Sequence, residues 1–327
     1  MQETKFYIGL DVHSKSTDYV VRTLWGDIVL EGKCASTYQD LKEQLQSYYH
    51  SCVVGIEACT FFYPLRAGFL GDDVVVRVAN VLRIRQLVST NDRVDARRLS
   101  DMLRLGTFPE SYIPDKDVQE LRDLVVLRHS FLQELNRMQS RIWAHITRKG
   151  IRVLERSLFS KKGFLVVKQA AESLADTNLK MLIIHYEAVG ERLEQATASL
   201  ISFVKEHFPD EWSKLQEIDG IGPITSSYII AEACPITRFS SEKKLRRYAG
   251  VIPVTQDSAG KSYGNRIPKT TSRALLRWAF VQAAHGAVRK KSSKLREYYR
   301  VKKKAKGKGT IMIIARAISD KVYASLN

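Results

Sequence analysis

The sequence has few cysteines and no long apolar segment. Its four cysteines, at positions 34, 52, 59 and 234, form no C-x-x-C motif and no Cys/His spacing of a metal site, which indicates reduced thiols. No apolar run approaches the roughly 18–20 residues that span a bilayer. The first residues lead directly into a strand pattern, which leaves no room for a signal peptide. We therefore expect a cytoplasmic protein without a membrane partner.

Acidic residues are scarce in one long stretch of the chain. Between Arg238 and Lys308 there are 21 lysines and arginines against three acids, a net charge of +18, whereas the whole chain carries +17. A field of one sign confined to one region is typical of proteins that bind nucleic-acid phosphates. A basic surface that serves solubility alone more often mixes the two signs. Nucleic acid is therefore a better partner than an anionic membrane.

The 327 residues, 44% of them hydrophobic, suffice for two domains or for one domain with a long helical insert. Strand patterns over residues 5–11, 17–23 and 27–31 precede alternating helices and strands, which predicts a mixed α/β sheet. Apolar spacing over residues 117–147 and 174–205 predicts two long helices. They would form an antiparallel hairpin or a coiled-coil spacer that also dimerises.

Four acids of the N-terminal part suggest a metal site. Asp11 and Glu57 close two predicted strands, where open α/β sheets place their ligand crevice. Asp92 and Asp95 stand three apart in a helical pattern, so their carboxylates would share one face. Like charges this close favour a cation between them, and oxygen ligands favour Mg²⁺ or Mn²⁺. Convergence of all four would suit two-metal phosphoryl chemistry in a ribonuclease-H-like arrangement; strand caps and a solvated helix start are the alternatives.

The segment from Leu215 to Thr225 has the pattern of a helix-hairpin-helix. An apolar helix end is followed by Gly-Ile-Gly, with Gly220 and Gly222, and then by Pro223 at the start of a new helix. Glycines permit a tight turn in which main-chain N–H groups and the next helix N-terminus face a phosphate. A plain helical hairpin without a ligand is the alternative.

A polar loop is predicted over residues 256–264, and a basic turn over residues 302–308. Within the first, Ser258 taken alone is a loop serine, because no Ser-His-Asp spacing accompanies it. Basic side chains in and after this loop are candidates for contact with a nucleic-acid backbone. They are Lys261, Arg266, Lys269, Arg273 and Arg277.

Taken in order, these elements resemble those of the DEDD-type insertion-sequence transposases, which include the Piv-like DNA invertases and the bridge-RNA-guided recombinases. The resemblance covers nearly the whole chain. It is carried by Tyr7-Ile8-Gly9-Leu10-Asp11, Ile56-Glu57-Ala58, Asn91–Ala96, the Ile218–Pro223 hairpin, and Tyr248-Ala249-Gly250 followed by Ser258-Ala259-Gly260.

The resemblance implies a RuvC-like catalytic domain over residues 1–115, a coiled-coil spacer over 116–207 and a helical C-terminal transposase domain over 208–327. Asp11, Glu57, Asp92 and Asp95 would hold the metal, and Ser258 would be the nucleophile. The implied partners are donor and target DNA, a non-coding guide RNA and further copies of the chain, as a dimer or tetramer. The implied location is the cytoplasm of a prokaryote, at the nucleoid.

This chain departs from the family pattern at two places. Cys59-Thr60 stands where many relatives have Thr-Gly or Cys-Gly, and Ser258-Ala259-Gly260-Lys261-Ser262 stands where others have Ser-Gly-Ser, so Ser262 is a rival nucleophile. Other functions remain open from the residues alone. They are a RuvC-like nuclease that uses water, a DNA-binding protein with an idle nuclease fold, and an actin-like ATPase, for which Val12-His13-Ser14-Lys15 lacks the required glycine-rich loop.

Overall fold

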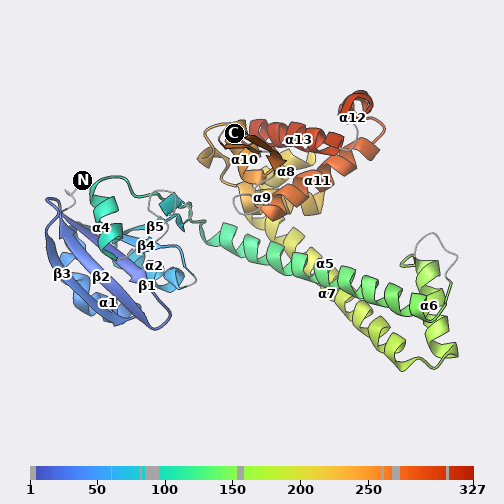
Figure 1. Cartoon of the computed structure of the whole chain (residues 1–327), viewed down its shortest axis with the longest axis horizontal. Coiled ribbons are helices and arrows are strands. Elements are labelled where there is room, and N and C mark those ends of the chain that lie inside the picture. The colour runs from blue at the N-terminus through green and yellow to red at the C-terminus, as the bar shows by residue number, and fades with distance from the viewer. Residues whose placement is uncertain are drawn as a thin grey trace. The chain divides into compact units, whose positions relative to one another are not determined.

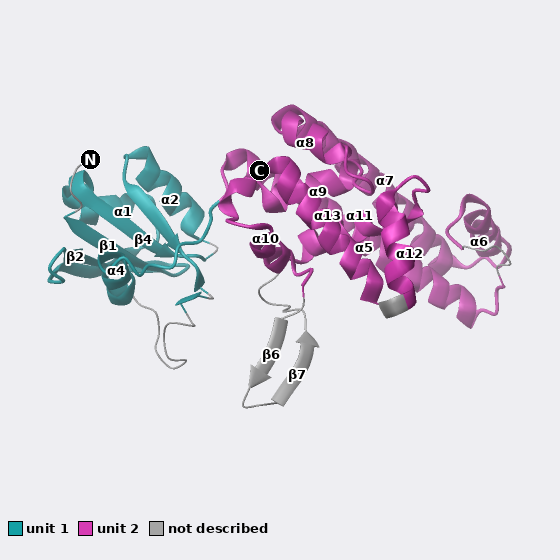
Figure 2. Ribbon diagram, turned by 90° about the horizontal axis from the view of Figure 1, so that it is seen from above, with its two compact units in different colours: residues 1–113 teal, residues 114–327 magenta. Residues whose placement is uncertain are grey.

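The structure is a computed structural model that describes residues 5–59, 61–81, 83–84, 96–152, 158–252, 254–258, 261–266, 273–306 and 309–327. Of residues 254–258, 261–266 and 305–306 it describes the backbone alone. The chain forms two compact units, Met1–Ile113 and Pro114–Asn327 (Figure 2). The predicted boundaries at residues 115 and 207 stay predictions.

Unit 1 is built on a five-stranded sheet with the strand order β3-β2-β1-β4-β5 (Figure 1). The first three strands pair antiparallel, and β4 and β5 extend the sheet in parallel with β1. The mixed α/β sheet predicted from the sequence is thus confirmed. Its elements are β1 (Phe6–Val12), β2 (Ser16–Thr23), β3 (Ile28–Ala35), α1 (Tyr38–Leu45), the 3₁₀ helix η1 (Gln46–Ser51), β4 (Cys52–Glu57), α2 (Phe62–Gly71), β5 (Val75–Ala79) and α4 (Ala96–Arg104).

The two faces of this sheet differ because side chains alternate along a strand. In β1, Ile8 and Leu10 enter the core that includes residues of α1 and α2. Tyr7, on the opposite face, packs with Leu99 and Leu103 of α4. The same alternation runs along β4, so the sheet separates a large core from a smaller one covered by α4.

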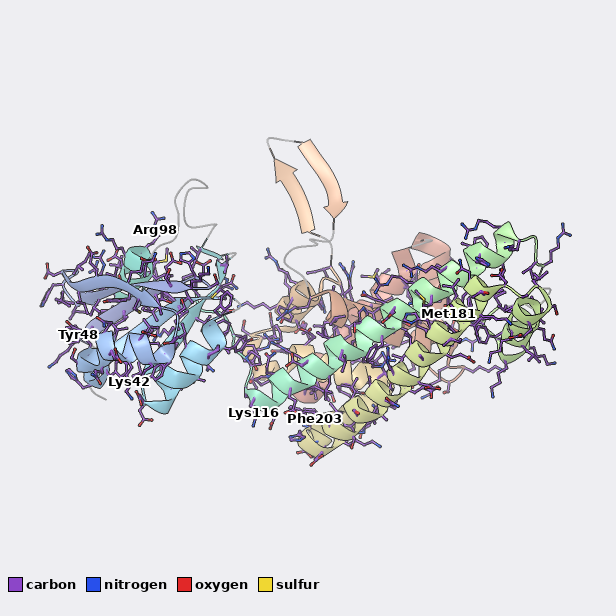
Figure 3. The ribbon with its side chains drawn as sticks, turned by 90° about the horizontal axis from the view of Figure 1, so that it is seen from below. Lys42, Tyr48, Arg98, Lys116, Met181 and Phe203 are labelled. Atoms are coloured by element: carbon purple, nitrogen blue, oxygen red, sulfur yellow. The ribbon has the colours of Figure 1, made fainter. Side chains whose placement is uncertain are left out.

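Unit 2 begins with a long antiparallel helical hairpin. Helices α5 (Lys116–Arg148) and α7 (Thr177–His207) lie side by side, and α6 (Lys161–Ser173) lies at the tip (Figure 1). Lys116 and Phe203 are seen at the same end of this hairpin, and Met181 at the other (Figure 3). The two long helices predicted at 117–147 and 174–205 are therefore confirmed to within a few residues; the coiled coil stays a prediction.

The remaining helices enclose the main apolar core of unit 2, with Tyr228 and Phe280 as its largest fully buried side chains. Arg128 of α5 is also buried there, and it donates hydrogen bonds to Thr197 Oγ1 at 2.9 Å and to the Tyr228 hydroxyl at 3.2 Å. The helices that enclose this core are α8 (Pro209–Gln216), α9 (Pro223–Ala233), the 3₁₀ helix η2 (Ile236–Arg238), α10 (Glu242–Ala249), α11 (Ala274–Arg289), α12 (Lys294–Lys306) and α13 (Thr310–Leu326).

Two predictions of irregular structure are wrong. Residues 256–264 do not form a loop, because β6 (Val254–Ser258) and β7 (Lys261–Arg266) pair antiparallel across much of that segment. Polar residues enter such a ladder because its hydrogen bonds come from the backbone. The basic turn over residues 302–308 is also wrong as far as residue 306, since α12 continues to there. Lysine is a good helix former, and Lys302 and Lys303 lie 5.5 and 5.6 Å from the rings of Tyr298 and Tyr299, one turn earlier.

Candidate active site

Asp11 and Glu57 lie next to each other at the carboxyl ends of two paired strands. The parallel ladder between β1 and β4 ends with the pair Leu10 and Ile56, and each acid follows its member of that pair. Leu10 and Ile56 face the larger core, so alternation places both carboxylates on the opposite face, the one that α4 covers. Two of the four predicted acids are therefore brought together.

Helix α4 approaches this face closely because β1 has a glycine there. A Cβ on Gly9 would lie 2.0 Å from the carbonyl oxygen of Ala96 and 2.6 Å from the backbone nitrogen of Ser100. Arg22 pairs with Tyr7, near the amino end of β1, in the antiparallel ladder. Its side chain donates to Ser100 Oγ at 3.1 Å and to the Gly26 carbonyl at 2.7 Å. Helix α4 thus runs antiparallel to β1, and its N-terminus is directed toward the end of the strand that carries Asp11.

The other two predicted acids, Asp92 and Asp95, lie outside the described residues. Helix α4 begins at Ala96, the residue that follows Asp95 in the sequence. The helix start predicted at the aspartate pair is therefore neither supported nor contradicted.

Two further groups near Asp11 were not predicted from the sequence. His13 Nε2 lies 3.4 Å from Asp11 Oδ2, and Asp18 stands opposite Asp11 across the antiparallel ladder. One ligand atom from each of these three residues fits within 4.8 Å of the others. Lys33 forms an ion pair with Asp18 at 3.2 Å. Asp18 could have been found from the strand register, because a tight β1–β2 connection places it across from Asp11. No sequence pattern indicated His13.

Carboxylate and imidazole groups in this arrangement suit a divalent cation. Asp11 has a side chain that is 21% exposed, so it is neither sealed off from a ligand nor fully solvated. The donor set of Asp11 and Glu57 is oxygen-only, as Mg²⁺ and Mn²⁺ prefer. An added imidazole would favour a transition metal over Mg²⁺.

The candidate nucleophile lies in the other unit. Ser258 is the last residue of β6, and its backbone is paired with Lys261 at the start of β7. The side chains of Ser258, its rival Ser262, and the basic residues Lys261 and Arg266 are outside the described part of the chain, as is the whole of Lys269.

The turn between α8 and α9 packs inward at its first glycine. Gly220 has a φ of +92°, and a Cβ there would lie 2.1 Å from the carbonyl oxygen of Ala283 in α11. Lys290 Nζ donates to Asp219 Oδ1 at 2.5 Å and holds the pKa of that carboxyl below its ordinary value. These contacts explain Gly220 by packing against α11. The glycine is required here whether or not a phosphate binds.

The second glycine of this turn has more space. Apart from its chain neighbours, no described residue has an atom within 4 Å of a Cβ placed on Gly222, which precedes α9. Its N–H, however, donates to Thr225 Oγ1 at 2.8 Å. A phosphate contact through this N–H would have to replace that hydrogen bond, so the phosphate-binding role of both glycines stays a prediction.

Two of the predicted basic residues are described with their side chains, and both belong to α11 or its start. Arg277 lies within the helix and is partly buried. Arg273 precedes the helix, where its side chain is 49% exposed and pairs with Glu232 at 3.4 Å. Arg273 is thus held by contacts within the protein, which sequence patterns did not indicate.

Comparison with known proteins identifies the family. Residues 8–150 match the family model of DEDD transposases of the IS110 type, and residues 213–300 match the model described as transposase of the IS116/IS110/IS902 family. A curated protein of Sinorhizobium fredii (strain NBRC 101917 / NGR234), named "Putative transposase y4pF/y4sB", is 23% identical over 214 residues, or 64% of this chain. The match spans about half of that relative, 54% of its length. No described helix is long and apolar enough to cross a membrane. The two family models match two separate parts of one sequence and together cover more than half of it, and the chain belongs to the IS110 family of DEDD-type transposases.

Proposed function

We propose that this protein is the DNA transposase of an insertion sequence, which cuts and rejoins DNA through Ser258 with the help of a divalent-cation site. The observation that carries the proposal is the placement of Asp11 and Glu57 side by side, on the sheet face that α4 covers. Helix α4 directs its N-terminus toward that edge and starts one residue after Asp95. The fold of unit 1 would then be ribonuclease-H-like, as in RuvC.

Asp11, Glu57, Asp92 and Asp95 would hold Mg²⁺ or Mn²⁺. The carboxylates already described fit such an ion, because they share one face and offer oxygen atoms. A cation bound there would neutralise charge on the scissile phosphate and on the oxygen that leaves it. The role of the chain is to keep the four acids on one face, which the close contact of α4 with Gly9 favours.

Ser258 would attack the phosphorus of a DNA backbone. A bond forms between its Oγ and phosphorus, a phosphorus–oxygen bond to a sugar breaks, and the hydroxyl proton ends on the leaving sugar oxygen. The reverse reaction with another DNA end restores the serine hydroxyl and the phosphodiester. Because the covalent link conserves the phosphodiester bond, strands are exchanged and rejoined without ATP.

The basic C-terminal part would supply contacts to both DNA backbones. Residues 238–308 carry a net charge of +18, and side chains of this kind hold phosphates without reading sequence. Sequence choice would then come from a non-coding guide RNA that pairs with donor and target DNA. The catalytic acids and the serine belong to different units, and they would meet between copies of the chain in a dimer or tetramer, at the nucleoid in the cytoplasm.

The test is to trap the protein–DNA adduct with the full chain, the guide RNA encoded beside the gene, and labelled donor and target DNA. Wild type is expected to form an adduct that resists denaturant. Ser258→Ala should form none, while the matched control Ser262→Ala should retain it. Adduct formation by Ser258→Ala that is lost in Ser262→Ala would move the nucleophile to Ser262. DNA cleavage without an adduct in all three proteins would replace the proposal with a nuclease that uses water.

A further inference from the structure

Two residues that flank the β6–β7 hairpin in the sequence are hydrogen-bonded to each other, and we call this pair the base of the hairpin. The N–H of Arg273 donates to the Tyr248 carbonyl at 2.9 Å, and Arg273 Nε donates to the Tyr248 hydroxyl, also at 2.9 Å. Tyr248 lies near the end of α10, before the hairpin, and Arg273 lies after it, at the start of α11. These two contacts join the segment that enters the hairpin to the segment that leaves it.

A buried carboxylate also contacts the base of the hairpin. Glu232, in α9, has a side chain that is 8% exposed, and its Oε2 lies 3.4 Å from Arg273 Nε. A buried carboxylate is costly unless a cation accompanies it. The position of Arg273 is therefore coupled to the charge of Glu232 in the core of unit 2.

The ring of Tyr248 lies near two guanidinium groups. The Arg238 guanidinium lies 4.7 Å from the ring centroid and that of Arg273 lies 5.9 Å from it. Arg238 is anchored in turn, because its Nη2 donates to the Glu232 carbonyl at 2.5 Å. Glu232 thus meets both arginines, one through its side chain and one through its backbone. Beyond Tyr248, the Val251 carbonyl accepts from Arg316 Nε at 2.6 Å.

We propose that Glu232 is a positioning residue for the serine hairpin. Through Arg273 and Tyr248, its buried carboxylate fixes the base of β6–β7, and with it the direction in which Ser258 is presented. The inference rests on the proposed role of Ser258. In this role Glu232 contacts neither DNA nor metal; it acts only by holding the base of the hairpin in one arrangement.

The experiment compares Glu232→Gln with wild type by two readouts. Hydrogen exchange at the Arg273 amide reports the hydrogen bond at the base of the hairpin and does not depend on the role of Ser258. Adduct yield at saturating DNA reports presentation of the nucleophile. Glu232→Gln should speed the exchange at least about tenfold and lower the adduct yield by about 10- to 100-fold, since a misplacement of about 1 Å can cost about 100-fold in rate. DNA affinity should remain within about threefold of wild type, because the basic surface is intact.

Two more variants keep the test sharp. Tyr248→Phe removes one acceptor without disturbing the core, and it should change both readouts in the same direction as Glu232→Gln, by less. Asp320→Asn is the matched control, because its ion pair with Arg246 also anchors α10 but not the base of the hairpin. It should leave exchange at Arg273 and adduct yield as in wild type.

Unchanged exchange at Arg273 in Glu232→Gln would overturn the inference, as would equal changes in Asp320→Asn. Should Ser258→Ala still form the adduct, the proposed function fails instead, and exchange at Arg273 still decides whether Glu232 holds the hairpin.

Discussion

The carbonyl oxygen of Ala96 lies directly over Gly9, at a distance that leaves no space for a Cβ on the strand residue. The first turn of α4 and the middle of β1 are therefore in backbone contact. This contact determines how closely the helix start approaches the edge that carries Asp11 and Glu57. A side chain at Gly9 would push the helix away from the candidate active site.

Gly9→Ala should destabilise unit 1 and abolish adduct formation, because α4 must shift by the width of a methyl group. Overpacking of this kind costs about 1–3 kcal/mol. Calorimetry of the full chain measures the loss. Gly71→Ala is the control, since no described residue outside its own helix turn has an atom within 4 Å of a Cβ at Gly71, and its effect should stay within about 0.5 kcal/mol. Wild-type stability of Gly9→Ala would contradict the described contact.

Asp11→Asn should remove both divalent-cation binding and strand transfer. In wild type, Mn²⁺ at about 100 times its Kd should stabilise the fold by about 2.7 kcal/mol, because the ion binds the folded state alone. The variant should lose this gain and at least about 100-fold in adduct rate. Thermal unfolding with and without Mn²⁺ measures the first effect. Asp73→Asn, at an exposed acid of the same unit, should behave as wild type; an undiminished gain in Asp11→Asn would exclude Asp11 as a ligand.

Arg128→Met should destabilise unit 2 although the new side chain is apolar. Arg128 is 6% exposed and its guanidinium donates to Thr197 and Tyr228, so the substitution leaves two hydroxyl groups without this donor. Hydrogen bonds from a charged donor contribute about 1.5–3 kcal/mol each, and we expect a loss of about 3 kcal/mol. Tyr228→Phe should cost about 1 kcal/mol. In the double variant, denaturant unfolding should show less than the sum of the two losses, whereas strict additivity would mean that the two side chains are not coupled.

The tip of the helical hairpin should weaken in acid. Asp176 precedes α7, and hydrogen bonds from His145, at 2.7 Å, and from the Leu179 N–H lower the pKa of its carboxyl. A lowered pKa in the folded state means stability that is present above the unfolded pKa of about 3.9 and is lost as pH falls through the folded value. Amide exchange in α6 and α7 should therefore rise below about pH 4.

Asp176→Asn separates this charge effect from helix capping, because asparagine still accepts the Leu179 N–H. The variant should show the faster exchange already at neutral pH and no further acid-dependent rise at the start of α7. A rise as large as that of wild type would assign the acid sensitivity to other carboxylates.

The long helices were predictable from the sequence because their apolar spacing repeats over many turns. The signal for α5 and α7 does not depend on neighbours, and the observed bounds, Lys116–Arg148 and Thr177–His207, differ from the predicted ones by a few residues. Placement of Asp11 and Glu57 at strand ends was likewise predictable, since parallel strands meet at one edge of a sheet. The β6–β7 hairpin was missed, because its pairing comes from backbone groups that every polar loop also has.

The sequence alone determined the acids at two strand ends, the helical periodicity and a basic C-terminal region, because each of these features depends on residues that are close together along the chain. Only the tertiary structure decided which of these meet. In the folded chain Gly220 packs against α11, Glu232 pairs with Arg273, and His13 and Asp18 lie beside Asp11. Such contacts depend on strand register and helix packing, which no local pattern of residues specifies.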